Sequence, residues 1–244
     1  MTALVGAELL KVRTTRVLLW VALPIPAFLI LSIGPQISTS AFEADLISTQ
    51  RSILEPAGIA IVFAVVLGIV TTSGEYAHGT ITHSFLVAPR RERVVAAKVM
   101  VGALFGVLLA LLAEALTLAI AVPWLAAKGV DLHLGERDLY MVFVAAAIGS
   151  AIGGALGVGL GGLLRRQTPA IVLTLTWLLI GENALAAIGD RARFTPARAF
   201  AALVAAQGPH DGLLGMWTGC ALAVGYAAAF VAAGAVAIIR RDVG

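Results

Sequence analysis

The stretch TTSGEYAHGTITHSFLVAPRRERVVAAK, residues 71–98, is a polar interruption between two long apolar runs. It contains two acidic residues, two histidines and four basic residues. A helix needs about 20 mostly apolar residues to cross roughly 30 Å of hydrocarbon, and the neighbouring runs at 53–73 and 97–124 meet that length. The stretch is therefore predicted to connect two transmembrane helices at a membrane surface, and its side of the membrane determines the topology.

The composition of the whole chain also indicates a membrane protein. Of its 244 residues, 60% are hydrophobic and 13% are charged, and the mean hydropathy is +0.97. An average soluble domain has roughly 25% charged residues. We therefore expect a single transmembrane domain over residues 1–244. The net charge of +3 is too small to indicate a nucleic-acid partner, and the only cysteine, Cys220, cannot form an internal disulfide.

Six apolar runs predict an all-α integral membrane protein with six transmembrane helices. They cover residues 17–37, 53–73, 97–124, 139–163, 169–188 and 213–239. Pro24 and Pro26 remove two backbone donors from the first helix and predict a bend there. Thr168 and Pro169 have the pattern of an N-cap followed by a first-turn proline, which separates the fifth helix from the fourth.

Residues 1–16 are predicted to form an amphipathic interfacial helix on the inner membrane surface. Leu4, Val5, Leu9 and Val12 fall on one face of such a helix. An ordinary charged leader is one alternative, and a cleaved signal peptide is another. The signal peptide is disfavoured because the first apolar run is longer than the roughly 7 to 15 residues typical of such peptides.

The distribution of lysine and arginine predicts the orientation. Six spans place both termini on one side, and eleven of the 17 basic residues lie on that side, against six on the other. Because an excess of positive charge marks the cytoplasmic face, both termini, the 71–98 connection and the Arg165–Arg166 turn are predicted to be cytoplasmic. Arginine outnumbers lysine 14 to 3 and alanine is abundant, which is typical of a bacterium with a GC-rich genome. We therefore expect a bacterial inner-membrane protein.

A strip of glycines marks the fourth span. Gly149, Gly153, Gly157 and Gly161 recur at every fourth residue and share one helical face. Such a strip lets another helix approach closely and gain van der Waals contact. We expect helix packing within one chain here, with a dimer interface as the alternative.

The chain lacks the common catalytic motifs. It has no G-x-x-x-x-G-K-[ST] phosphate loop, no H-E-x-x-H zinc motif and no G-x-S-x-G nucleophile elbow, so we expect neither a catalytic nor a metal site. Glu114 and Glu182 are acids within predicted spans. An ionised acid at mid-bilayer costs roughly 2.5–3.5 kcal/mol, so both are expected to face protein or water and are candidates for a substrate path. A buried structural acid is the alternative for Glu114, and hydrogen bonding near a helix end, beside Asn183, is the alternative for Glu182.

The sequence GEYAHGTITHSFLVAPRRERVVAAK, residues 74–98, combines an E-x-x-x-G-T-I pattern with a proline, an arginine cluster and a lysine that enters the next span. This pattern resembles that of ATP-binding-cassette type-2 permeases. The layout is similar too, because an E-x-x-K-like sequence at residues 8–11 precedes six predicted spans. The resemblance implies the type-2 permease fold, with a cytoplasmic coupling helix between the second and third spans.

On the matching positions, the resemblance implies contact with a separate ATPase subunit. The contact residues would be Glu75, His78, Gly79, Thr80, Ile81, Thr82, Pro89, Arg90 and Arg91. The ATPase would bind ATP and Mg²⁺, and this chain would hold no cofactor. Two permease copies, identical or related, would assemble with two ATPases, and membrane lipid is the other expected partner.

The implied function is ATP-driven export of a hydrophobic or amphipathic molecule, such as a drug, an antibiotic or a lipid, by alternating access. The cavity is expected between the first, second and fifth spans of both copies. A short outer helix is expected within residues 195–209, which start with Thr-Pro and stop with Gly-Pro. The alternatives are a proton-coupled secondary transporter that uses Glu114 and Glu182, and a membrane scaffold that transports nothing.

Overall fold

The computed structural model describes residues 1–39, 46–77, 79, 90–186, 190–205 and 213–240. Within these ranges the regular secondary structure is entirely helical, so the predicted all-α class is confirmed. Five helices are long and apolar enough to cross a membrane: Val17–Ser38, Ile47–Ala77, Arg91–Ala126, Arg137–Leu164 and Met216–Ile238. The chain thus has the helices of a multi-pass membrane protein.

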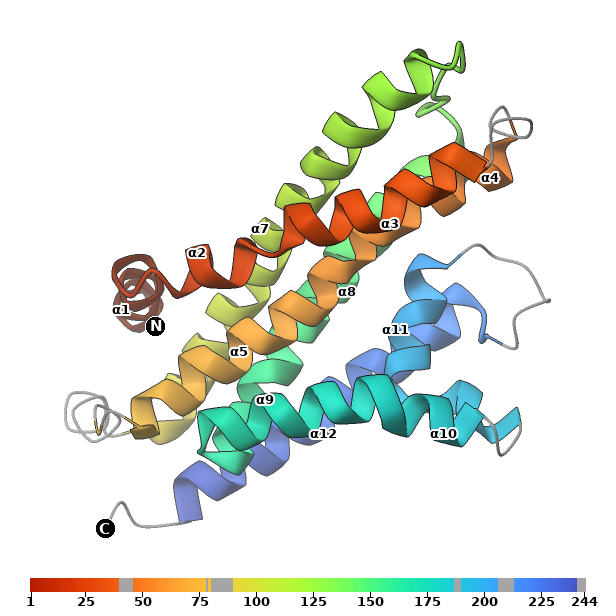
Figure 1. The fold of residues 1–244 in the computed structure, drawn as a ribbon. Coiled ribbons are helices and arrows are strands. Elements are labelled where there is room, and N and C mark those ends of the chain that lie inside the picture. Colours follow the sequence, from red (N-terminus) through yellow and green to blue (C-terminus); the bar gives the residue numbers. More distant parts are fainter. Residues whose placement is uncertain (40–45, 78, 80–89, 187–189, 206–212, 241–244) are drawn as a thin grey trace.

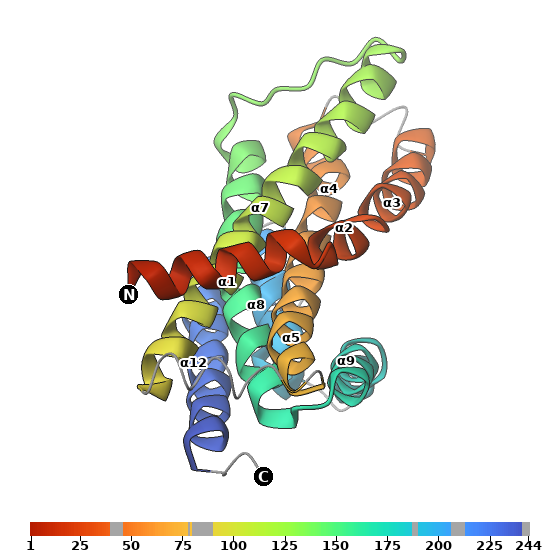
Figure 2. The same cartoon turned by 90° about the vertical axis from the view of Figure 1, so that its left-hand side faces the viewer.

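The N-terminal part of the fold begins with α1 (Thr2–Thr14), which lies across the helix bundle (Figure 2). The first apolar run then forms α2 (Val17–Ala22) and α3 (Ile25–Thr39). The helix is interrupted between Ala22 and Ile25, so the bend predicted at the proline pair is confirmed. The helix predicted within residues 1–16 is present over residues 2–14, but Val5, Leu9 and Val12 of its predicted apolar face pack against the core of the bundle. Its place on a membrane surface stays a prediction.

The second apolar helix begins earlier than residue 53. It consists of α4 (Ile47–Leu54), the 3₁₀ segment η1 (Glu55–Ile59) and α5 (Ala60–Ala77). The added turns are polar, and loops satisfy their buried side chains. The Gln50 amide donates to the Asp131 carbonyl oxygen (2.9 Å) and accepts from the His133 N–H (3.1 Å), while Arg51 donates to the Ala205 carbonyl oxygen (2.7 Å). Hydropathy alone missed this extension because its residues are polar.

The C-terminal part contains two long helices joined by shorter ones. α7 (Arg91–Ala126) and α8 (Arg137–Leu164) are followed by α9 (Gln167–Thr176), the π-helical segment η2 (Trp177–Gly181) and α10 (Glu182–Ala186). After these come the 3₁₀ segment η3 (Asp190–Phe194), α11 (Pro196–Val204) and α12 (Met216–Arg240).

The predicted fifth span, 169–188, corresponds to a run that is helical without a break from Gln167 to Ala186. Its apolar part, Gln167–Gly181, is shorter than the other five apolar helices, so six spans remain a proposal. The helix also starts one residue before the predicted Thr168 N-cap, with Arg166 as its N-cap. Pro169 is tolerated there because the first-turn N–H groups have no partner within a helix.

The glycine strip of α8 lies against α5 of the same chain. A Cβ atom added at Gly157 would lie 2.1 Å from the Val65 carbonyl oxygen, and one at Gly161 would lie 2.8 Å from that of Ile69. A Cβ at Gly153 would lie 3.0 Å from the Ile61 carbonyl oxygen, and one at Gly149 would lie 2.6 Å from the Ile61 side chain. The two backbones are therefore in direct contact, and the strip is occupied within the chain.

Two further sides of α8 make equally close contacts. A Cβ at Gly154 would lie 2.2 Å from the Gly102 carbonyl oxygen of α7, and one at Gly234 of α12 would lie 2.5 Å from the Gly159 carbonyl oxygen. α8 is thus the central helix of the bundle, with α5, α7 and α12 packed around it (Figures 1 and 2).

The helix ends that flank the predicted cytoplasmic segments gather at one end of the bundle. The end of α5, the start of α7, the turn between α8 and α9 and the end of α12 lie together at the lower left of Figure 1, on the side where α1 crosses. α4 and α10 lie at the opposite end. This arrangement agrees with one shared side for the basic segments, and the assignment of that side to the cytoplasm stays a prediction.

Candidate functional site

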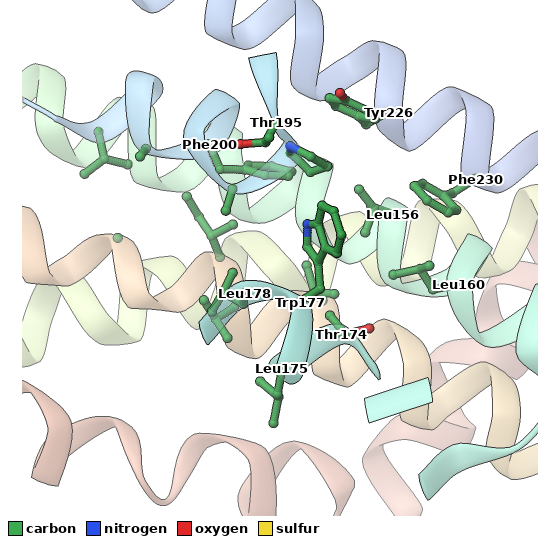
Figure 3. Close-up of a pocket in the computed structure, with 18 of the residues that line it drawn as sticks. Leu156, Leu160, Thr174, Leu175, Trp177, Leu178, Thr195, Phe200, Tyr226 and Phe230 are labelled. Atoms are coloured by element: carbon green, nitrogen blue, oxygen red, sulfur yellow. The ribbon is translucent and has the colours of Figure 1, made fainter. Parts of the chain in front are cut away.

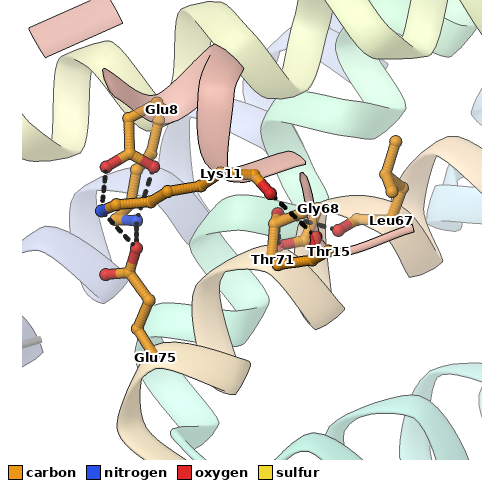
Figure 4. Close-up of polar contacts among 8 residues, drawn as sticks. Glu8, Lys11, Thr15, Leu67, Gly68, Thr71 and Glu75 are labelled. Carbon is orange, nitrogen blue, oxygen red and sulfur yellow. Dashed lines mark hydrogen bonds and ion pairs between the residues drawn. The ribbon is translucent and has the colours of Figure 1, made fainter. Parts of the chain in front are cut away.

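Four charged residues meet at the end of the bundle where α1 crosses (Figure 4). The Lys98 ammonium group lies 2.6 Å from Glu75 Oε1 and 2.8 Å from Glu8 Oε2. Lys11 lies 2.8 Å from both Glu75 Oε1 and Glu8 Oε1. We call Glu8, Lys11, Glu75 and Lys98 the four-charge cluster. It joins three helices, α1, α5 and α7.

The cluster is largely removed from solvent. The exposed fractions of its side chains are 4% for Lys98, 9% for Glu75, 10% for Glu8 and 40% for Lys11. Burial acts to raise the pKa of Glu8, but the ammonium groups of Lys98 and Lys11 outweigh it and hold this pKa below its ordinary value. Burial acts to lower the pKa of Lys11, and its hydrogen bonds with Glu75 and Glu8 raise it instead. Two acids and two bases thus neutralise each other.

Helix geometry explains how the chain assembles this cluster. Glu8 and Lys11 are three residues apart on α1 and therefore lie on the same face. Glu75 is close to the end of α5, and Lys98 is two turns into α7. The E-x-x-K pattern was visible in the sequence, but its pairing with Glu75 and Lys98 was not. The sequence signal for this pairing was that Glu75 and Lys98 lie at the ends of two apolar runs.

The structure describes four of the predicted ATPase-contact residues. Glu75 faces α1 and α7, so its carboxylate is engaged within the chain. Gly79 has φ +67°, a left-handed conformation that favours glycine, and its N–H donates to the Tyr76 carbonyl oxygen (3.3 Å). Arg90 is the N-cap of α7, and Arg91 donates to the Ile238 carbonyl oxygen of α12 (3.3 Å). The predicted contacts at His78, Thr80, Ile81, Thr82 and Pro89 lie outside the described residues.

A second arginine also binds the end of α12. Arg165, which ends α8 with φ +56°, donates to the Ala237 carbonyl oxygen and lies 5.1 Å from the ring centroid of Tyr76. Carbonyl groups at a helix C-terminus are unsatisfied within the helix and carry partial negative charge. Arg91 and Arg165 therefore fix the end of α12 to the ends of α7 and α8.

An apolar cavity of about 890 Å³ lies on the other side of α5 and α8. Its walls come from η1, α5, α8, α9, η2, η3, α11 and α12, and include Ile61, Val65, Leu156, Leu160, Leu173, Trp177, Phe194, Phe200, Tyr226 and Phe230. Figure 3 shows Trp177 of η2 pointing across the cavity toward Thr195, with Tyr226 and Phe230 of α12 on the far side. This cavity lies within one chain, whereas the expected cavity lies between two copies. The first apolar helix, which we expected to line the cavity, has no residue among its walls.

Glu182 lies behind the wall of this cavity. It is 6% exposed and accepts hydrogen bonds from the Trp177 indole N–H (3.0 Å) and the Ala197 backbone N–H (3.0 Å). The Thr195 hydroxyl also donates to it. Ala197 is in the first turn of α11, so the Glu182 carboxylate satisfies an N–H group that the helix leaves free. This agrees with hydrogen bonding near a helix end, the alternative given for Glu182.

The π-helical segment η2 explains the position of the indole ring. A π-turn widens an α-helix locally and is frequent at functional sites. A Cβ atom at Gly181 would lie 2.8 Å from the ring of Trp177, so glycine allows the ring to rest on its own helix. No pattern in the sequence predicted this π-turn.

Glu114 is the other acid predicted within a membrane span. Glu114 lies on α7, half-buried, and is not among the cavity-lining residues. Within the described part of the chain, its Oε1 atom has no hydrogen-bond partner.

The helix expected within residues 195–209 is α11. Thr195 is its N-cap, Pro196 is its first residue, and it ends at Val204. The predicted Gly-Pro stop lies outside the described residues.

No family model and no curated protein matches the chain. Its function is therefore inferred from the four-charge cluster, the apolar cavity and the sequence pattern around Glu75.

Proposed function

We propose that this chain is the permease subunit of an ATP-driven exporter of the ATP-binding-cassette type-2 class. It would span a bacterial inner membrane six times, with Gln167–Ala186 as the fifth span and both termini in the cytoplasm. Its cargo would be a hydrophobic or amphipathic molecule. Five long apolar helices and the resemblance of residues 74–98 support this proposal.

The four-charge cluster is the observation that carries the proposal. Glu75 begins the predicted coupling segment, residues 75–91, and Lys98 follows that segment in the sequence. Glu75 binds Lys11 of α1, and Lys98 binds Glu8 of α1. Buried ion pairs contribute little net stability, because desolvation of each ion costs several kcal/mol, by an order-of-magnitude estimate. Their value is geometric: they fix α1, α5 and α7 to one another. A force applied at the coupling segment would therefore move all three helices together.

The source of that force is a separate subunit. The sequence has no phosphate loop, so ATP and Mg²⁺ would bind to a partner ATPase. Gly79 and Arg90 are exposed beside the cluster and are available to such a partner. Two ATPases and two permease copies would form the exporter, and ATP-driven closure of the ATPases would switch the access of the cargo path.

The test is a comparison of two glycines with the same backbone conformation. Gly79 (φ +67°) lies in the coupling segment, and Gly129 (φ +74°) lies in the loop after α7 at the opposite end; a Cβ at either meets nothing within 4 Å. The permease is co-purified with the ATPase encoded beside it and reconstituted in lipid. Gly79→Val should abolish stimulation of ATP hydrolysis by the permease, and Gly129→Val should leave it intact.

Equal stimulation in both variants would show that residues 75–91 do not receive the ATPase and would reject the proposal. The absence of any ATPase that co-purifies with the wild-type chain would reject it as well. A co-purified ATPase that the permease does not stimulate would favour a scaffold.

A proton-coupled secondary transporter remains the alternative. Glu182 accepts three hydrogen bonds within the chain, which favours Glu114 as the acid for proton exchange. Transport by the purified chain alone, driven by a pH gradient across a liposome and lost in Glu114→Gln, would establish that alternative.

A further inference from the structure

We infer that the apolar cavity is a binding site for a single hydrocarbon chain of a membrane amphiphile, which enters from the bilayer past the exposed side chains of Leu173, Trp177 and Phe194. As an account of cargo recognition, this inference rests on the proposed function. The binding itself requires only this chain.

The polar side chains in the cavity wall are all engaged by the protein. They are Glu55, Thr174, Trp177, Thr195 and Tyr226. Tyr226 donates to the Phe194 carbonyl oxygen (2.7 Å), Thr174 donates to that of Ala170 (2.8 Å), and Glu55 lies 3.7 Å from the Arg51 guanidinium. Trp177 and Thr195 both donate to Glu182. A ligand thus meets a mostly apolar wall whose polar side chains already bind other protein groups, which favours an apolar occupant over a sugar, a nucleotide or a peptide.

The size of the cavity suits a ligand. Ligand pockets in proteins measure roughly 300–1,000 Å³, and the 890 Å³ observed here falls within that range. Water fills such a space poorly, because apolar cavities stay dry without polar partners. An apolar molecule is the remaining choice.

The shape of the cavity favours a chain over a compact ring system. Its wall runs from Glu55 to Val65 along η1 and α5, and from Leu156 to Leu164 along α8. The contact between Gly157 and Val65 places these two rows end to end with a short overlap. At about 1.5 Å per helical residue, the lined length is about 25 Å, close to the roughly 30 Å thickness of a hydrocarbon core.

The mouth of the cavity faces outward from the bundle. Leu173, Trp177 and Phe194 line the cavity and are 57%, 46% and 46% exposed. These three side chains are apolar, and the Arg193 guanidinium lies over the Phe194 ring, 5.0 Å from its centroid. A chain can therefore slide in sideways from the lipid while its head group stays at the membrane surface.

The experiment uses tryptophan quenching in the purified full-length chain in detergent. Trp20, Trp124 and Trp217 are replaced by phenylalanine, which leaves Trp177 as the single tryptophan. The probe is a phosphatidylcholine with a dibrominated stearoyl chain, added at low mole fraction. A matched reporter keeps Trp217 alone, since that side chain is 76% exposed on α12 and outside the cavity wall.

Quenching of Trp177 should saturate and be reversed by the same lipid without bromine, while quenching of Trp217 should rise in proportion to the probe. Ala201→Phe, which fills the cavity from α11, should weaken the saturable binding at least about tenfold. Ala119→Phe, at an exposed position on α7, should have no effect.

Proportional quenching of Trp177, or saturable quenching that Ala201→Phe leaves unchanged, would overturn the inference. If a brominated sterol binds the cavity with higher affinity than the unbrominated lipid, the inference that the occupant is a hydrocarbon chain is overturned. Because the ATPase takes no part, these outcomes leave the glycine test of the proposed function unaffected.

Discussion

Lys98→Met should destabilise the chain far more than Lys11→Met, although both ammonium groups bind the same oxygen of Glu75 at 2.6 and 2.8 Å. The difference comes from burial, because the Lys98 side chain is 4% exposed and that of Lys11 is 40% exposed. Loss of one partner of a buried pair costs about 3–5 kcal/mol, since it leaves an uncompensated charge. A half-exposed pair is screened by solvent and contributes about 0–1 kcal/mol.

Thermal unfolding of the purified chain in detergent measures the difference. For a chain of this size, about 1 kcal/mol corresponds to roughly 2–4 °C in Tm. Lys98→Met should therefore lower Tm by about 10 °C, and Lys11→Met by at most about 4 °C. The double variant Lys98→Met with Glu75→Gln should recover most of the loss, because it removes the carboxylate that Lys98 neutralised.

Equal losses for the two lysine variants would refute the assignment of Lys98 as the buried centre of the cluster. A double variant as unstable as Lys98→Met alone would show that the loss comes from packing of the lysine stem, not from an unpaired charge.

Three further predictions concern the pH range of the fold and its closest contacts. Folding lowers the pKa of Glu8 and raises that of Lys11, so the stability of the fold should fall as the pH drops below about 4.5 and as it rises above about 10.5. A pH series of unfolding curves measures this, and Glu8→Gln should remove the loss on the acid side. Gly157→Leu should prevent folding or lower Tm by more than about 10 °C, because the leucine side chain would overlap the α5 backbone. The control Gly225→Leu, at an open position on α12, should fold normally, as judged by size-exclusion chromatography and circular dichroism. Glu182→Ala should cost about 1–2 kcal/mol through loss of the α11 cap and should shift the tryptophan emission, because the indole N–H loses its partner; an unchanged spectrum would contradict the assigned hydrogen bond.

Hydropathy predicted where the helices lie in the sequence, but it did not predict how they pack against one another. The apolar runs located the five long helices, and the prolines at 24 and 26 located the bend. A helix that is apolar all round carries no periodic signal of which face meets a neighbour. The spacing of Gly149 to Gly161 therefore predicted a close contact without identifying α5 as the partner.

The candidate site was predicted in part for a similar reason. Glu75 stood out as a charge next to an apolar run, and we related it to an external partner. Its contacts with Lys11 and Lys98 depend on residues 64 and 23 positions away, and no local pattern encodes them. The cavity arises from the packing of several helices and could not be seen in any one of them.

The contacts of α8 restrict which parts of the molecule are free to move. Where two backbones touch, a sideways shift of even 1 Å brings carbonyl oxygens into overlap, so α5, α7, α8 and α12 must travel as one rigid body. The run from α9 to α10 packs against α5 and α8 without such glycine contacts, and the apolar cavity lies beside it. If the cavity opens, this run would therefore move rather than the four helices, and the hydrogen bonds from Thr195 and Ala197 to Glu182 would have to break.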